Sequence, residues 1–274
     1  MELRDKAVRL RELHRPGEPV IMFNVWDAAS ARIVEELGAP AVATSSAAIA
    51  WLEGFPDGQY ISRERMLAGA KRVASAVDVP VTADLEGGYG PSVEDAAATA
   101  RGAIEAGAVG LNFEDAGEPG TLVDADFQCK RIEAMVEMGQ RLGVPLVINA
   151  RTDVFLGDIG PDDVWRLRET LDRGKRFLQA GAGCVFVPGV TDEPTIEALV
   201  KGIPGPINIL ASATAPPVSR LAQLGVARVS VGGAPYGHVL AHFRTAARQA
   251  LREGRFDFAS ERIPHAELNA LFLR

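Results

Sequence analysis

Three acidic residues stand directly after short apolar runs, where they could share one site. Asp84 and Glu86 follow the run 80–83, and Glu114 follows the run 110–113. Asp84 and Glu86 are two residues apart, so their side chains point to the same side while the backbone stays extended. Carboxylates brought together raise one another's pKa unless a cation compensates them, and oxygen ligands without His or Cys favour Mg²⁺ or Mn²⁺. We therefore predict a metal site here; the alternative is three acids that cap helices or face solvent.

Polar residues after other apolar runs could bind an anion. Arg151 ends the run 147–150, where it could grip a carboxylate or phosphonate with two parallel hydrogen bonds or neutralise the nearby acids. Ser45, Ser46 and Ala47 offer small side chains and backbone N–H groups suited to a developing enolate oxygen, although a plain serine-rich turn explains them equally well.

Two more polar residues belong to the same set of candidates. Asn208 stands in a later apolar run, 206–210, and is a candidate for substrate binding. Tyr89 comes three residues after Glu86, so it could donate a proton to a bound substrate or form an aromatic wall beside it.

These residues need elements that bring them to one place, and the chain has a regular pattern of such elements. Proline precedes four apolar runs and glycine precedes four others, in alternation, with helical spacing between them, as in 92–106, 126–142 and 162–180. Both residues mark the end of a helix, and short apolar strands alternating with helices predict a parallel sheet. Eight strands fit an α/β fold of the (β/α)₈ TIM-barrel type, with one domain over 1–274, in which the strand ends meet at one mouth. The alternative, an open doubly wound sheet, would place Gly-x-Gly-x-x-Gly after the first strand, and that motif is missing.

The composition narrows the class of protein. The 274 residues include 29 Lys plus Arg and 36 Asp plus Glu, for a net charge of −7, so the chain has no general attraction for nucleic acid or anionic lipid. No signal peptide or membrane-spanning stretch is readable. The two cysteines cannot form a disulfide framework, which suits a reducing compartment. We predict a soluble, cytoplasmic protein with a small-molecule ligand and neither nucleic acid nor membrane as a partner.

At these motifs the sequence resembles the isocitrate lyase/phosphoenolpyruvate mutase superfamily. The segment 84–90, Asp-Leu-Glu-Gly-Gly-Tyr-Gly, is similar to the family element Asp-x-Asp-x-Gly-(Phe/Tyr)-Gly, with Glu as its second acid. The segments 44–47, 54–57, 111–115 and 150–153 resemble further family motifs in the same order. The resemblance implies a Mg²⁺-dependent (or Mn²⁺-dependent) enzyme that acts on small 2-oxo or 2-hydroxy acids through an enolate.

The resemblance also implies roles for individual residues. Glu86 would hold the metal directly and the two other acids mostly through water. Arg151 would bind the substrate carboxylate, and the backbone at 45–47 would bind other substrate oxygens. Trp26 would form a wall of the pocket, and Asp57 falls where the family has an acid near the bound substrate.

The segment 115–128, a candidate active-site lid, departs from the family pattern. Lyases of the family carry Lys-(Lys/Arg)-Cys-Gly-His there and the mutases a Lys and Asn-Ser, and neither motif is present. Three functions stay open: a carbon–carbon lyase or decarboxylase for an isocitrate, methylisocitrate or oxaloacetate type of substrate; a phosphoenolpyruvate or carboxyphosphonoenolpyruvate mutase or phosphonopyruvate hydrolase; and a catalytically weak 2-oxo acid binder. We expect the first.

The last segment, 235–274, is predicted to be a helical oligomerisation segment. Leu268, Leu271 and Phe272 stand at helical spacing, and a single barrel has little left to cover with them. Family relatives exchange their last helices, so the resemblance implies a homo-oligomer, either a dimer or a homotetramer.

Overall fold

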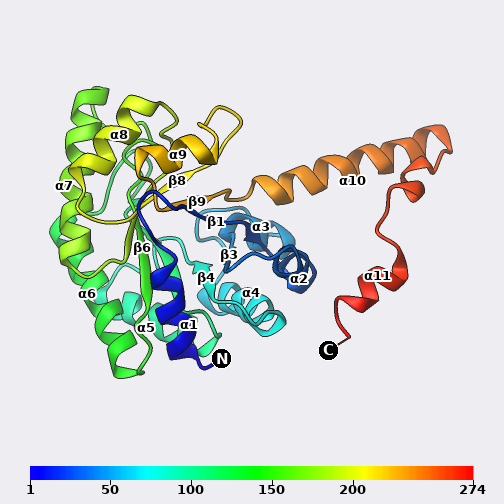
Figure 1. Cartoon of the computed structure of the whole chain (residues 1–274), viewed down its shortest axis with the longest axis horizontal. Coiled ribbons are helices and arrows are strands. Elements are labelled where there is room, and N and C mark those ends of the chain that lie inside the picture. Colours follow the sequence, from blue (N-terminus) through cyan, green and yellow to red (C-terminus); the bar gives the residue numbers. More distant parts are fainter. Residues whose placement is uncertain (274) are drawn as a thin grey trace.

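The computed structural model describes residues 1–273, and its centre is a parallel β-sheet closed into a barrel (Figure 1). The strand order is β1-β9-β8-β7-β6-β5-β4-β3-β2. β1 and β2 are halves of one chain segment separated by Phe23 alone; β1 pairs with β9 and β2 pairs with β3. The predicted TIM-type barrel is therefore confirmed. The strands are β1 (Val20–Met22), β2 (Asn24–Val25), β3 (Val42–Thr44), β4 (Val81–Asp84), β5 (Gly110–Glu114), β6 (Val147–Arg151), β7 (Cys184–Val187), β8 (Ile207–Leu210) and β9 (Arg228–Ser230).

Helices follow the strands and surround the barrel. Most begin at an Asp or Ser whose side chain accepts a backbone N–H of the first turn, the cap that such residues favour. The three helices predicted from spacing are confirmed as α5, α6 and α7. The helices around the barrel are α1 (Leu3–Glu12), α2 (Ala28–Glu36), α3 (Ser46–Leu52), α4 (Arg63–Ala76), α5 (Val93–Glu105), α6 (Ala125–Arg141), α7 (Asp163–Gln179), α8 (Glu193–Gly202) and α9 (Val218–Leu224).

The strands separate an apolar outer layer from a polar interior. Val25, Val42 and Val81 are buried in one apolar cluster with residues of α2 and α4, as expected for strands covered by helices. On the opposite face of the sheet, Asn112 contacts Asn149 and Asp84. The barrel thus points its hydrogen-bonding side chains inward and toward the carboxyl ends of the strands, which we call the mouth.

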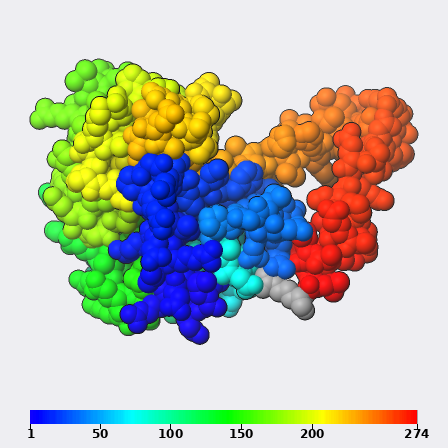
Figure 2. Space-filling view, in the orientation of Figure 1, coloured from blue at the N-terminus to red at the C-terminus, as the bar shows by residue number. Residues whose placement is uncertain are grey.

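The chain beyond β9 leaves the barrel as an arm. α10 (Ala234–Glu253) projects away from it, and a 3₁₀ turn (Asp257–Ser260) leads back to α11 (His265–Ala270) (Figures 1 and 2). None of the residues of α10 is buried. We call residues 234–273 the C-terminal arm.

The end of the arm touches its own barrel. The Arg32 guanidinium on α2 donates from Nε to the Leu271 carbonyl oxygen at 2.7 Å, and Leu271 is buried. Part of the segment predicted to pack on a neighbouring subunit therefore packs on this chain. Within residues 1–273 no helix has the length and apolar character needed to cross a membrane.

Candidate active site

Neighbouring strands bring three acids together at the mouth. Asp84 is the last residue of β4 and Glu114 the last of β5, and Glu86 comes two residues after β4. β4 and β5 pair in parallel. Burial raises the pKa of Glu86 and of Glu114, and the negative charge of Asp84 raises both further. The three carboxyl groups therefore interact electrostatically.

Glu86 lies in a strained turn, which differs from the extended backbone expected between it and Asp84. Its φ is +49°, in the left-handed region that non-glycine residues seldom adopt outside functional sites. Its Oε1 accepts the Tyr89 hydroxyl at 2.8 Å and its Oε2 accepts the Gln59 backbone N–H at 2.6 Å. Burial outweighs these bonds and raises the pKa of Glu86 to about 7, so its carboxyl can exchange a proton near neutral pH.

Arg151 ends β6 and joins two acids. Its Nη1 lies 2.6 Å from Glu114 Oε2, and its Nε and Nη2 donate to the two Asp153 carboxylate oxygens at 2.5 and 2.8 Å. Burial lowers the pKa of Arg151, but these two carboxylates outweigh burial and leave it raised. Arg151 thus neutralises nearby acids, and each terminal nitrogen carries a second hydrogen that can donate to a substrate carboxylate.

Asp57 and Tyr89 come from loops at the same mouth. Asp57 lies on the exposed loop between α3 and α4, where partial desolvation and then the charge of Asp84 raise its pKa. Burial, followed by the Glu86 charge, raises the pKa of Tyr89. The Tyr89 hydroxyl therefore stays protonated, and its proton is directed to Glu86.

Most hydrogen-bonding groups at the start of the loop after β3 already bond to other groups of the protein. Ser46 donates its backbone N–H and its hydroxyl to Asp84 Oδ2, at 3.0 and 2.8 Å. The Ser45 N–H donates to the Val25 carbonyl oxygen, and the Ser45 hydroxyl oxygen caps α3. Of the backbone donors predicted to bind substrate, the Ala47 N–H belongs to the first helical turn, where no intrahelical acceptor exists.

Trp26 and Asn208 lie at different depths. Trp26 follows β2 and packs edge-on against Tyr236, with ring centroids 5.0 Å apart. Asn208 is the second residue of β8, is fully buried, and accepts the Ser230 hydroxyl at 3.3 Å. Trp26 therefore stands at the rim, whereas Asn208 is in the barrel interior, two residues before the carboxyl end of its strand.

Side chains of α5 and α6 donate hydrogen bonds to the backbone of the turn that carries Glu86. Arg131 of α6 donates to the Gly87 and Gly90 carbonyl oxygens at 2.5 and 2.8 Å and lies over the Phe113 ring. Thr99 of α5 donates to the Gly88 carbonyl oxygen at 2.7 Å. A cavity of about 770 Å³ opens beside this turn, and Gly87, Arg131 and the loop after β5 are among its walls. The support fixes the strained turn in place.

The segment 115–128 divides into a hairpin and the start of a helix. Ala116 pairs with Leu122 in an antiparallel bridge, whereas 125–128 form the first turn of α6. The tip between them is exposed. The part of the predicted lid with room to move is thus the hairpin 116–123.

A buried ion pair anchors this hairpin at both ends. Asp115 is fully buried, and its carboxylate accepts from Arg173 Nη1 at 3.1 Å and from the Asp153 backbone N–H at 2.9 Å. Arg173 also donates to the Val123 carbonyl oxygen at 2.9 Å. Arg173 of α7 therefore joins the end of β5 to the end of the hairpin.

The oxygen atoms of Asp84, Glu86 and Glu114 determine whether a divalent metal ion fits between them. Within residues 1–273 no three Asp, Glu, His or Cys side chains form a compact metal-binding group; Asp84, Glu86 and Glu114 each bond to protein donors instead. Burial first and the neighbouring acids second raise the pKa of Glu86 and of Glu114, so a cation at the mouth would stabilise their charged forms. Such an oxygen set fits a hard cation that keeps several of its waters, as Mg²⁺ does.

Sequence reasoning missed several residues around this site. Asn112 and Arg228 are polar residues inside apolar strands, and that mismatch was a readable signal for an inward-facing role. Arg131 and Arg173 lie on helices among other arginines, so nothing in their spacing set them apart. Asp153 was noted only as the last residue of the motif 150–153, without a role of its own.

Comparison with known proteins agrees with this architecture. The family described as phosphoenolpyruvate phosphomutase matches residues 10–251. An oxaloacetate decarboxylase of Bradyrhizobium sp. (strain ORS 278) is 28% identical, with 100% of this chain and 94% of that protein covered. A 2,3-dimethylmalate lyase of Eubacterium barkeri is 30% identical, with 73% and 68% covered.

The structures agree as well. A crystal structure from Burkholderia cenocepacia J2315, provisionally assigned as a phosphonomutase, is 40% identical and superposes with a TM-score of 0.86, covering 91% of this chain and 100% of that one. The mouth described above lies within the matched region. The chain therefore belongs to the phosphoenolpyruvate phosphomutase family and is an enzyme of the isocitrate lyase/phosphoenolpyruvate mutase superfamily.

Proposed function

We propose that this enzyme is a Mg²⁺-dependent carbon–carbon lyase for a small 2-oxo or 2-hydroxy carboxylate, with oxaloacetate as the first substrate to test. The observation that carries the proposal is the position of Asp84, Glu86 and Glu114 at the carboxyl ends of two paired strands, beside Arg151. The resemblance to an oxaloacetate decarboxylase over the whole chain supports the choice of substrate.

The three acids would hold the metal, Glu86 directly and the others mostly through water. When bound, the metal supplies a Lewis acid that draws electron density from the 2-oxo group. Arg151 would orient the substrate carboxylate with its remaining hydrogens. Breaking the bond between C3 and C4 releases CO₂ and leaves the electron pair on an enolate, which takes up one proton to give pyruvate.

The chain offers groups for the enolate and for the proton. The Ala47 N–H belongs to the first turn of α3, and we propose it as the backbone donor that stabilises developing negative charge. The Tyr89 hydroxyl, 2.8 Å from Glu86 Oε1, and Asp57 are the candidate proton carriers. The hairpin 116–123 would exclude water while the enolate exists.

A second candidate is phosphorus–carbon chemistry, which the 40% identity to the provisionally assigned phosphonomutase favours. The two are separated by incubating the full chain with Mg²⁺ and either oxaloacetate or phosphonopyruvate, following pyruvate release and phosphorus NMR. We expect pyruvate from oxaloacetate, its loss with EDTA, and recovery with added Mg²⁺. Conversion of phosphonopyruvate alone would establish the second candidate, and turnover unaffected by EDTA would refute both metal-dependent reactions.

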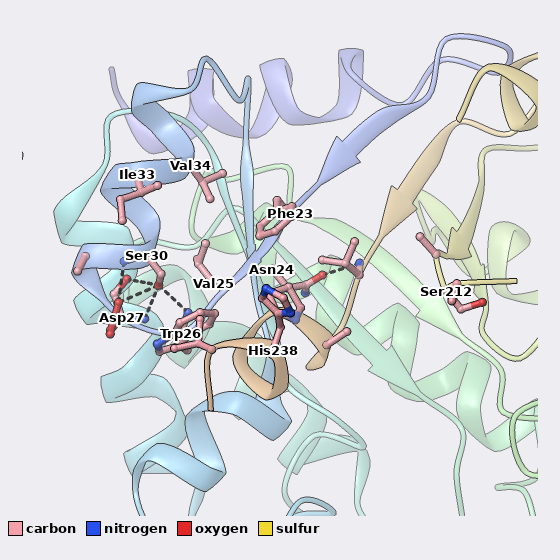
Figure 3. A pocket seen from close by; sticks show the side chains of 17 residues that line it. Phe23, Asn24, Val25, Trp26, Asp27, Ser30, Ile33, Val34, Ser212 and His238 are labelled. Atoms are coloured by element: carbon pink, nitrogen blue, oxygen red, sulfur yellow. Dashed lines mark hydrogen bonds between the residues drawn. The ribbon is translucent and has the colours of Figure 1, made fainter. Parts of the chain in front are cut away.

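We also propose that the enzyme is a dimer or tetramer in which α10 is exchanged. In a (β/α)₈ barrel an outer helix covers each pair of strands. Here, Ile21 on β1 is 46% exposed and Phe23, which follows β1, is 42% exposed. A largely apolar pocket of about 740 Å³ lies there, bounded by α2, Ala211 and the start of α10 (Figure 3). The exposed apolar face of α10 from a second copy supplies a helix of the right kind for this gap.

A further inference from the structure

Arg228 is a buried charge without an ion pair. It lies on β9 with 1% of its surface exposed, and the ion pairs found within residues 1–273 do not include it. Its Nη2 lies 3.4 Å from Asn112 Oδ1, while its Nε and Nη1 are buried without a partner in the described part of the chain. Burial lowers the pKa of Arg228 to about 10, so it stays charged at pH 7. Such a charge costs stability, because an apolar residue of similar size is often better tolerated.

From Arg228 a line of hydrogen bonds leads to the candidate metal site. Asn112 Oδ1 accepts from Asn149 Nδ2 at 2.7 Å and from Arg228, which leaves the Asn112 Nδ2 group to donate to Asp84 Oδ1 at 3.3 Å. The other Asp84 oxygen is held by Ser46. Asp84 is thus fixed on both oxygens, one of them through Asn112.

The two asparagines alone would not set the direction of this line. Asn149 Oδ1 has no partner, so both carboxamides could turn over together, keep their mutual bond, and present Asn112 Oδ1 to the Asp84 carboxylate. Arg228 adds to the penalty on that arrangement, because its N–H groups would then face the Asn112 NH₂ group while Asn112 Oδ1 would face the acceptor-only Asp84 carboxylate. The guanidinium therefore strengthens the orientation in which Asn112 donates to Asp84.

We propose that Arg228 is a positioning residue: acting through the Asn112 carboxamide, it holds Asp84 in the orientation that binds the metal or its water. This inference rests on the proposed metal site, but it concerns residues that do not touch the metal. It also explains why the barrel keeps an unpaired buried charge.

The sign of the change in metal affinity tests the proposal. If Arg228 acted only as a positive charge, the R228M substitution would remove a repulsion and tighten Mn²⁺ binding. If it positions Asp84, R228M weakens Mn²⁺ binding by roughly tenfold, the lower end for a group behind a metal ligand. Mn²⁺ titration of the full chain, followed by electron paramagnetic resonance, measures this without turnover. Unchanged or tighter binding overturns the proposal.

Three further variants separate positioning from damage to the barrel. R228Q keeps a donor without the charge, so it should recover part of the affinity that R228M loses. N112A removes the same relay from its other end; it should weaken binding at least as much, and R228M should add no further weakening in that background. S230A, an equally buried neighbour outside the relay, is the matched control and should stay within about twofold.

A metal-free readout keeps this test separate from the proposed function. Absence of Mn²⁺ binding to the wild-type chain would refute the metal site, not the relay. A crystal structure of metal-free R228M should show Asp84 Oδ1 no longer within hydrogen-bond distance of Asn112. Should R228M fail to fold, R228Q and N112A give the same comparison; an unmoved Asp84 with unchanged Mn²⁺ affinity refutes the positioning role.

Discussion

The barrel mouth and the C-terminal arm differ in which side chains they bury and which they expose. At the mouth, charged groups such as Glu86, Asp115 and Arg173 are buried and bonded to residues from distant parts of the chain. Along α10, apolar groups such as Phe243 and Leu251 are 69% and 86% exposed. A solvent-exposed row of apolar side chains is typical of a surface awaiting a partner.

The difference shows which region forms its contacts within one chain and which region leaves its apolar surface uncovered. The acids at the mouth are costly to bury, and the barrel imposes their positions; the proposed metal ion would compensate their charge. The arm gains nothing from its apolar residues until another surface covers them. The first region fits the chemistry proposed above, and the second fits the proposed exchange of α10 between subunits.

The largest expected effect tests the mouth as a site of chemistry. E86A should lower turnover by roughly 10³-fold or more, because it removes the residue proposed to hold the metal directly. It should leave the melting temperature unchanged or higher, since a crowded buried carboxylate is lost. Steady-state rates and thermal melts measure both, with E94A on the exposed face of α5 as the control. Turnover near wild type would end the claim that the mouth is catalytic.

A second substitution tests whether the buried ion pair between Asp115 and Arg173 contributes to the free energy of unfolding. R173M leaves the Asp115 carboxylate buried without its partner, so the free energy of unfolding should fall by about 3 kcal/mol. The exposed pair of Arg220 and Glu193 is the contrast: R220M should cost less than about 1 kcal/mol. Urea unfolding gives both values. Equal losses would mean that the two ion pairs do not differ as burial predicts.

A third substitution acts on the arm. F243D places a charge on the exposed face of α10, where it should weaken self-association by more than about tenfold through desolvation of the new carboxylate. Light scattering across a concentration series measures the dissociation. V164D, at an 80% exposed residue of α7, is the matched control and should not alter the mass. A wild-type chain that is monomeric at micromolar concentration would remove the exchange proposal.

A fourth prediction concerns the pH dependence of the metal-free protein. The pKa of Glu86 rises from 4.5 to about 7 in the folded state, so protonation favours folding. Its contribution is fully present below pH 4.5 and is lost as the pH rises through 7, an effect of about 1–3 kcal/mol. Urea midpoints at pH 5 and pH 8 should show this difference. E86Q should reduce the difference without abolishing it, because burial also raises the pKa of Glu114 and of Asp115; an equally steep profile in E86Q would assign the effect to those groups.

The sequence by itself determined the barrel and the location of the mouth. Proline and glycine end helices through their own backbone chemistry, and continuous apolar runs must be buried, so the order of elements could be predicted locally. The acids Asp84, Glu86 and Glu114 could be placed at one mouth because each follows a strand. Their motifs also carried the family resemblance.

Only the tertiary structure decided how those groups are held. The turn at Glu86, the use of Ser46 as a donor to Asp84, and the pairing of Arg173 with Asp115 depend on contacts between residues 11 to 58 positions apart. The relay from Arg228 spans 116 positions to Asn112. No local spacing encodes such pairs, because their energies arise only when the closed barrel brings distant strands together and excludes water from between them.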